Sequence, residues 1–254
     1  MRPYFSIVIP TLNEEQFVGN LLEDLTLQTY RSFEILHIDG DSDDSTLSIV
    51  HSFADRLPIL SKRAGRRNLS YQRNLGGELA QGEYLIFVDA DTRLKDSSFL
   101  ECIYRHAQKT RCHIYLPRSQ FMGTAWMDVA AQYINNTMVR LSQMTPRPLP
   151  TSGLAIFRRD FFATLAGYTV SEKHDKKELF VEDHDIMIRA YRYHATREYV
   201  QDTEFGYSLR RYKKDGWLQV MKSVIPLVIQ LTFSAKTSDH TYEMGGQSYK
   251  APML

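Results

Sequence analysis

Short apolar segments alternate with amphipathic segments through the first 117 residues, and this alternation constrains the fold more than any other feature. We expect strands at 5–9, 33–38, 57–60, 84–88 and 113–116, and helices at 14–28, 45–53, 69–80 and 97–109. Strands that alternate with helices of roughly 10 to 15 residues indicate βαβ units. The sequence therefore predicts an α/β fold with a Rossmann-like, mostly parallel sheet and helices on both faces.

The alternation stops after Pro117. Helical spacing resumes over 124–143 and 181–193, and a further short strand is expected at 154–157. The proline-rich break at 145–150 favours extended backbone. We expect one domain over 1–205, with a nucleotide-binding half at 1–118 and an acceptor half at 119–205, followed by a C-terminal extension at 206–254.

Composition excludes several classes of protein. Among 254 residues, 31 Lys+Arg balance 30 Asp+Glu, so the net charge of +1 gives no reason to expect a nucleic-acid partner. Two cysteines make no disulfide framework and are typical of a reducing cytoplasm. A spanning helix needs about 18 or more apolar residues, and no run reaches that length. The basic, amphipathic stretch at 207–233 either contacts the inner face of a membrane peripherally or packs on the protein core.

An acidic triplet ends the most apolar predicted strand. Tyr84–Val88 is followed at once by Asp89-Ala90-Asp91. Ligands of open α/β sheets bind at the carboxyl ends of such strands. Two neighbouring carboxylates repel each other unless a cation neutralises them, and hard oxygen ligands favour Mg²⁺ or Mn²⁺. The alternative is that both acids only stabilise the following turn, where Asp is common.

Polar residues also follow the first two predicted strands. After the first, Thr11 or Asn13 is expected to cap a helix that begins near Glu14 and to present backbone N–H groups to a ligand. After the second, Asp39 is placed to accept hydrogen bonds from a base or a ribose. Asp43 and Asp44 are expected to cap the next helix. The basic run between residues 56 and 77 is either a solvated surface or a diphosphate clamp.

Five segments together resemble the ordered motifs of the family 2 glycosyltransferases, which are inverting enzymes with the GT-A fold. They are FSIVIPTLNEE, ILHIDGDSDDST, GRRNLSYQRNLGGELAQGEYLIFVDADT, TSGLAIFRRDFF and FVEDHDIMIRA, and the match that they define extends over roughly residues 4–195. The strict QxxRW pattern of processive synthases is missing, which disfavours polymer synthesis.

The resemblance implies a role for each matching residue. The nucleotide site would comprise Pro10, Thr11, Asn13, Glu14, Asp39, Arg66, Arg73, Asp89 and Ala90. Asp91, with Asp89, would hold Mn²⁺ or Mg²⁺, and Ser152 and Gly153 would form the acceptor-side loop. Asp183 would be the general base, beside Glu182. Arg210, Arg211 and Trp217 would close over the diphosphate.

These assignments predict transfer of a sugar from a nucleoside-diphosphate sugar, most simply a UDP-sugar, to an acceptor hydroxyl. The carboxylate would take the proton of the hydroxyl, while the metal ion and arginines stabilise the leaving diphosphate. The acceptor is left open among carbohydrates, lipid-linked acceptors and small molecules, as is homo-oligomerisation. Two alternatives remain at this point: a nucleotidyltransferase that makes the sugar nucleotide, and a non-catalytic protein that binds it.

Overall fold

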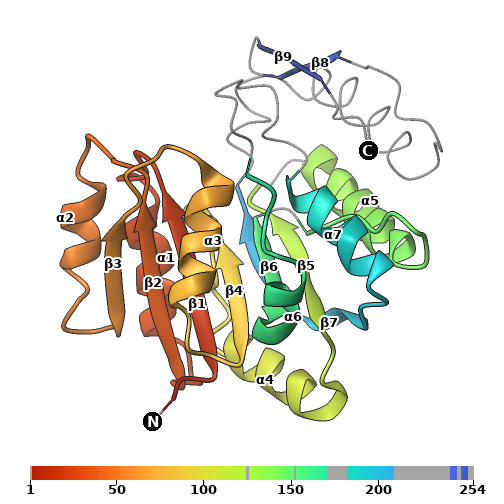
Figure 1. The fold of residues 1–254 in the computed structure, drawn as a ribbon, viewed down its shortest axis with the longest axis horizontal. Helices are drawn as coiled ribbons and strands as arrows, with labels where there is room; N and C mark the ends of the chain where they lie inside the picture. Colours follow the sequence, from red (N-terminus) through yellow and green to blue (C-terminus); the bar gives the residue numbers. More distant parts are fainter. Residues whose placement is uncertain are drawn as a thin grey trace. The chain divides into compact units, whose positions relative to one another are not determined.

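The structure is a computed structural model that describes residues 2–123, 126–151, 153–170, 182–208, 241–244 and 247–250 (Figure 1). The strands are β1 (Phe5–Thr11), β2 (Phe33–Asp39), β3 (Ile59–Arg63), β4 (Tyr84–Val88), β5 (Ile114–Phe121), β6 (Leu154–Arg158), β7 (Arg197–Tyr207), β8 (Thr241–Met244) and β9 (Gln247–Lys250). The helices are α1 (Val18–Thr26), α2 (Thr46–His51), α3 (Leu69–Leu79), α4 (Phe99–Thr110), α5 (Trp126–Ser142), α6 (Arg159–Thr164) and α7 (Glu182–Arg192).

A seven-stranded sheet has the order β3-β2-β1-β4-β6-β5-β7. The pairs β2/β3, β1/β2 and β1/β4 are parallel, as the alternation predicts, whereas β6 pairs antiparallel with both β4 and β5. An apolar run indicates that a strand is buried but not its direction, so the sequence alone could not predict these antiparallel pairs. The predicted α/β class is confirmed, with an antiparallel portion that the sequence did not reveal.

Helices cover both faces of this sheet (Figure 1). On one face, α1 and α4 pack their buried apolar residues against alternate residues of β1, including Phe5 and Ile7. On the other face α3 approaches closely, because a Cβ on Gly76 would lie 2.3 Å from Val8 Cγ1. Because β1 pairs in parallel with both β2 and β4, the carboxyl ends of these three strands lie at the same edge of the sheet.

The chain divides into two compact units. The first comprises Met1–Gln120, Thr151–Tyr168 and Ala195–Tyr207, and the second comprises Phe121–Pro150, Thr169–His194 and Ser208–Leu254. The sheet through β7 therefore belongs essentially to the first unit, and α5 and α7 belong to the second. The domain limits expected from the sequence remain predictions. Among the helices that the structure describes, none has the length and apolar character that a membrane span requires.

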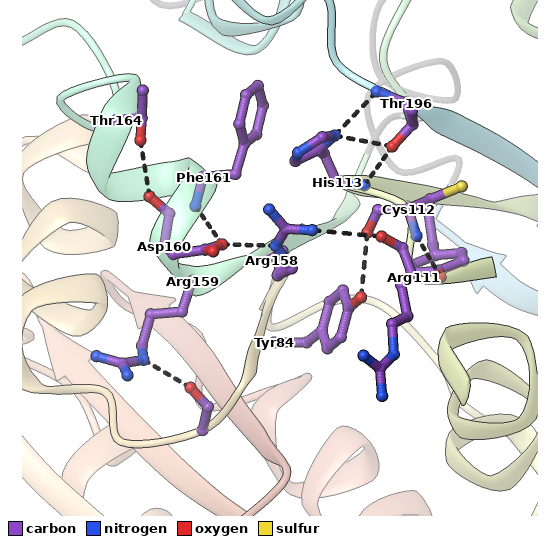
Figure 2. Close-up of polar contacts among 12 residues, drawn as sticks. Tyr84, Arg111, Cys112, His113, Arg158, Arg159, Asp160, Phe161, Thr164 and Thr196 are labelled. Atoms are coloured by element: carbon purple, nitrogen blue, oxygen red, sulfur yellow. Dashed lines mark hydrogen bonds and ion pairs between the residues drawn. The ribbon is translucent and has the colours of Figure 1, made fainter. Parts of the chain in front are cut away.

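A polar network lies at the amino end of β4, at the opposite end of this strand from the acids that follow it. Tyr84 pairs in register with Arg158 of β6, and Tyr84 Oη donates to Cys112 O at 3.1 Å. Arg158 Nε donates to Asp160 Oδ1 at 2.6 Å, and Arg159 Nε donates to Gly82 O at 2.7 Å (Figure 2). The polar groups at the amino end of β4 therefore form hydrogen bonds with other groups of the protein.

Candidate active site

The carboxyl ends of β1, β2 and β4 meet where the strand order reverses. From β1 the chain crosses first to β2 on one side and later to β4 on the other, which makes a topological switch point. Thr11 and Asp39 are paired neighbours at the ends of β1 and β2. The last paired residues of β1 and β4 are Val8 and Phe87, so Asp89 follows at the level of Pro10. The fold thus gathers these predicted site residues at one edge.

Asp39 is fully buried and accepts three hydrogen bonds. Thr11 Oγ1 donates to Oδ1 at 3.1 Å, Ser42 Oγ donates to Oδ1 at 2.5 Å, and Ser42 N donates to Oδ2 at 3.0 Å. A carboxylate has about four acceptor positions, so these contacts use most of its capacity. The base-reading role of Asp39 stays a prediction.

A buried histidine supports this arrangement and was not among the residues chosen from the sequence. His37 Nε2 lies 2.8 Å from Thr11 Oγ1, and its Nδ1 lies 2.8 Å from Ser61 Oγ. Burial lowers the pKa of His37 to about 4, and the charge of Asp39 only partly opposes this shift. A neutral imidazole that donates from Nε2 to Thr11 lets the threonine hydroxyl donate to Asp39. The one signal in the sequence is a histidine inside an apolar strand.

Backbone N–H groups of the loop after β1 donate to side chains of the loop after β2. The donors and acceptors are Asn13 N to Ser42 Oγ (3.0 Å), Glu14 N to Thr46 Oγ1 (2.9 Å) and Glu15 N to Asp44 Oδ2 (3.1 Å). In return, Asp43 N donates to Asn13 Oδ1 at 2.9 Å, and Ser45 N donates to Glu15 Oε2 at 2.9 Å. The two loops therefore hold each other in place without a ligand.

This exchange corrects the expected helix caps. Helix α1 begins at Val18 rather than near Glu14, and its N-cap is Phe17, whose side chain makes no capping hydrogen bond, so neither Thr11 nor Asn13 is the N-cap. At α2 the N-cap is Ser45, which also makes no capping bond.

The two acids expected to cap α2 behave differently. Asp44 Oδ1 accepts from Thr46 N at 3.0 Å at the start of the helix. Asp43 instead forms an exposed ion pair with Arg67, at 2.7 Å. Only Asp44 therefore serves the beginning of α2.

Arg73 holds the first acid of the triplet. Its Nη2 lies 3.0 Å from Asp89 Oδ1, with the Arg73 side chain 5% exposed and the Asp89 side chain 34% exposed. The Arg73 guanidinium also lies over the Tyr168 ring, 5.1 Å from its centroid. Arg66, by contrast, is half-buried over the ring of Tyr71. Arg73 is thus placed to orient Asp89, and its predicted contact with base or diphosphate is untested.

Gly153 lies against the same strand end. Its carbonyl oxygen accepts from Asp89 N at 2.9 Å and from Thr92 Oγ1 at 3.1 Å. It has φ +83°, and a Cβ there would lie 3.0 Å from Tyr207 Cδ2 and 3.2 Å from Thr92 Oγ1, so both the backbone conformation and the tight space favour glycine. The structure therefore brings Gly153 beside Asp89.

Four other predicted site residues lie outside the part of the chain that the structure describes. They are Ser152, Arg210, Arg211 and Trp217. Their predicted roles at the acceptor loop and over the diphosphate stay predictions.

Glu182 and Asp183 form the first turn of α7 in the second unit, and both are half-buried. The next acid, Asp185, accepts from Thr169 Oγ1 at 2.7 Å and pairs with Arg189 at 2.8 Å, so its role is to hold the helix.

His184, in the same turn of α7, is buried, with 3% of its surface exposed. Burial, followed by the nearby charge of Arg147, lowers its pKa to about 4. The side chain therefore packs into the second unit as a neutral imidazole at neutral pH.

Comparison with known proteins supports a single family. Residues 6–165 match the family model described as glycosyl transferase family 2. A curated relative, the PGL/p-HBAD biosynthesis glycosyltransferase of Mycobacterium tuberculosis, is 36% identical over 100 residues, which is 39% of each chain. The glycosyltransferase GlyG of Streptococcus pneumoniae is 28% identical over 112 residues, covering 43% of this chain and 36% of the relative. The matches thus span about two fifths of these relatives.

Solved structures share the fold. TarS 1–349 of Staphylococcus aureus in complex with UDP matches with a TM-score of 0.64 at 19% identity, covering 92% of this chain and 67% of that chain. A mannosyltransferase of Pyrobaculum calidifontis, solved with GDP-Man and Mn²⁺, matches with a TM-score of 0.68 at 19% identity, covering 88% and 61%. At this identity the likenesses show the fold alone, and they confirm the expected GT-A fold.

Proposed function

This chain belongs to glycosyl transferase family 2, and from that premise we propose that it moves a sugar from a nucleoside-diphosphate sugar to an acceptor hydroxyl with inversion at the anomeric carbon. The observation that carries the proposal is the convergence of Thr11, Asp39 and Asp89 at the carboxyl ends of β1, β2 and β4. This edge is where open α/β sheets bind nucleotides. The opposite end of β4 is occupied by its own polar network (Figure 2).

The acids after β4 fit a divalent ion. Asp89 and Asp91 offer hard oxygen donors, which suit Mn²⁺ or Mg²⁺. Because Asp89 Oδ1 is already bound by Arg73, we assign Asp91 as the main metal ligand and Asp89 as a supporting ligand that also lies near the ribose. The Mn²⁺ in the Pyrobaculum calidifontis complex supports a divalent metal ion in a fold of this kind. Such an ion would supply charge stabilisation for the leaving diphosphate.

The remaining roles fall to side chains of this chain. Asp183 would accept the proton of the acceptor hydroxyl as that oxygen attacks the face opposite the leaving group, which gives inversion. Glu182, in the same first turn, would support it. Arg66 would bind the diphosphate. This half-buried residue places its guanidinium over the Tyr71 ring, and a stacked guanidinium suits phosphate recognition. We keep Arg210, Arg211 and Trp217 as the residues that close over the diphosphate.

The loop after β1 argues against a nucleotidyltransferase. Such an enzyme would use the backbone N–H groups of this loop to cradle a triphosphate. Here the N–H groups of Asn13, Glu14 and Glu15 all donate to side chains of the next loop. The loop therefore acts as a wall of the proposed site. A non-catalytic binding protein would bind the donor without turnover, so measuring donor binding and sugar transfer on the same preparation distinguishes it from an enzyme.

We propose a UDP-sugar as the donor. The TarS complexes contain UDP or UDP-GlcNAc, whereas the Pyrobaculum calidifontis enzyme contains GDP-Man, so both bases need to be compared. The acceptor is a carbohydrate, a lipid-linked molecule or a small molecule that carries a free hydroxyl. We place the reaction in the cytoplasm, with peripheral contact to the inner face of the membrane through the basic C-terminal stretch as an extension of the proposal.

A thermal-shift screen with Mn²⁺ tests the proposal. UDP or a UDP-sugar at about 100 times its Kd should stabilise the protein by ~2.7 kcal/mol, which corresponds to a rise in Tm of roughly 5 to 10 °C. Asp91→Ala should remove the metal-dependent part of the rise. The matched control is Asp43→Ala, which removes an exposed acid of the β2 loop and should leave the rise intact. Full transferase activity in EDTA, or equal shifts in both variants, would contradict the metal assignment.

A further inference from the structure

Outside the proposed sugar-nucleotide site, a sulfur, a nitrogen and a carboxylate oxygen converge between α4 and β7. The Cys102 Sγ, a ring nitrogen of His106 and a carboxylate oxygen of Asp202 all lie within 4.8 Å of one another. All three residues belong to the first unit. We propose that Cys102, His106 and Asp202 bind a Zn²⁺ ion that fastens α4 to β7, the edge strand of the sheet.

The positions of the three side chains are compatible with a shared metal ion. Cys102 and His106 are four residues apart on α4, so they share one face of the helix. His106 Nε2 lies 2.9 Å from Asp202 Oδ1 and 3.1 Å from Oδ2. Ligand atoms around a tetrahedral Zn²⁺ are about 3.3 to 3.6 Å apart, given bond lengths of ~2.0 to 2.3 Å. Insertion of the ion therefore requires the His106–Asp202 contact to widen by a few tenths of an ångström, with Cys102 Sγ within 4.8 Å of both of the other ligand atoms.

The other nitrogen of His106 already has the partner that a metal-binding histidine needs. Nδ1 lies 2.6 Å from Glu198 Oε1, and Thr110 Oγ1 donates to Glu198 Oε2 at 2.6 Å. A histidine that binds metal through Nε2 characteristically donates its Nδ1–H to a carboxylate, which fixes the ring and its tautomer. Glu198 and Thr110 therefore act as positioning residues for His106.

The ligand set selects the ion. A thiolate, an imidazole and one carboxylate suit the borderline-soft Zn²⁺, whereas Mg²⁺ and Mn²⁺ prefer oxygen ligands alone. A water molecule would complete four-coordination, and Asp202, whose side chain is 59% exposed, leaves a route from solvent. This ligand chemistry also separates the proposed Zn²⁺ from the ion assigned to Asp91.

The thiol must lose its proton when the ion binds. Burial and then the neighbouring Asp202 raise the pKa of Cys102 to about 11, with Arg105 opposing and Asp96 adding to this shift. A bound dication reverses the balance, because a coordinated thiol is deprotonated. The alternative is a simple ion pair without metal, in which His106 bridges Glu198 and Asp202.

A titration of the full chain with Co²⁺, used as a coloured substitute for Zn²⁺, tests the site. Only a Co²⁺–thiolate bond gives the near-ultraviolet charge-transfer band, so an ion at the oxygen ligands of Asp89 and Asp91 makes no contribution to it. The wild-type protein should show the band with one equivalent bound, and added Zn²⁺ should abolish it by displacement. Absence of the band in the wild-type protein would overturn the proposal in favour of the simple ion pair.

Matched variants locate the ligands. Cys102→Ser should lose the band, whereas Cys112→Ser, at the other free cysteine, should keep it. Asp202→Asn tests the site at an exposed position where misfolding is not expected and should weaken Co²⁺ binding by at least tenfold. Glu198→Gln should weaken it by about 10- to 100-fold. Persistence of the band in Cys102→Ser, or unchanged affinity in Asp202→Asn, would refute the assignment.

Discussion

Arg73 Nη2 lies 3.0 Å from Asp89 Oδ1, so a buried cation holds the first of the two acids that follow β4. The same guanidinium lies over the Tyr168 ring, which fixes it from the other side. One charge of the acidic triplet is therefore neutralised by the protein itself. For this reason we propose that Asp91, rather than Asp89, is the main ligand of the metal ion.

Replacing Arg73 should damage both stability and transfer. Arg73→Ala leaves Asp89 without its buried partner, so we expect unfolding in urea to be easier by roughly 2 to 4 kcal/mol and activity to fall at least tenfold. Arg73→Lys keeps the charge but loses the planar stacking, and should be intermediate. Arg66→Ala is the control: it should cost under about 1 kcal/mol of stability while raising the KM for the donor. Equal stability losses at both arginines would argue against a special role for Arg73.

Gly153→Ala should disturb the end of β4 through two separable effects. A left-handed backbone costs a non-glycine residue about 1 to 2 kcal/mol, and at Gly153 the new methyl group would also press on Tyr207 and Thr92. Gly65→Ala is a matched control, because Gly65 has φ +65° but a Cβ there would meet nothing within 4 Å. Chemical denaturation should show a larger loss for Gly153→Ala, and only this variant should lose activity. Similar losses of stability in the two variants would mean that backbone strain alone accounts for the effect of Gly153→Ala.

Acid should destabilise the protein through its buried histidines. His37 and His184 each have a folded-state pKa of about 4 against an ordinary value of 6.5, so the unfolded chain binds more protons between these limits. Stability is therefore fully present above pH 6.5 and falls as the pH drops towards 4, by up to about 3 kcal/mol for each histidine. His37→Gln should make the dependence of unfolding free energy on pH shallower in this window. His194→Asn, at an exposed left-handed position that Asn tolerates, should not change it.

Asp183→Asn separates chemistry from donor binding. If Asp183 takes the proton of the acceptor, kcat should fall by about 10² to 10⁴, while donor affinity measured by calorimetry should stay within about twofold. Asp185→Asn is the control, since Asp185 is engaged by Arg189 and Thr169; it should lower Tm more than it lowers kcat. Near-normal turnover in Asp183→Asn would assign the base to another residue.

The elements that could be predicted from the sequence are those whose burial is indicated by a clear apolar pattern. Strand β4 has the predicted limits, because Tyr84–Val88 is uniformly apolar and bounded by polar residues. Strand β7 was not predicted, because Arg197–Tyr207 lies at an edge of the sheet and its charged and polar residues interrupt the apolar pattern of a strand. The antiparallel direction of β6 was likewise invisible, since strand direction depends on the crossovers and not on the apolar run.

Contacts between distant residues were harder to predict. Helix α1 was predicted to begin near Glu14 but begins at Val18, because the preceding loop donates its N–H groups to the loop after β2 and not to a local cap. The grouping of Cys102, His106 and Asp202 could not be seen at all, because about a hundred residues separate α4 from β7 in sequence and no short spacing motif marks the set. Sequence reasoning identified the strand-end acids because they follow strands directly.

The mutual hold of the loops after β1 and β2 has a thermodynamic consequence. Five hydrogen bonds between them form when the protein folds, so the conformational entropy of these loops is lost before any nucleotide arrives. Association with a ligand then meets a rigid partner, and little of the binding free energy is spent on ordering this part of the chain.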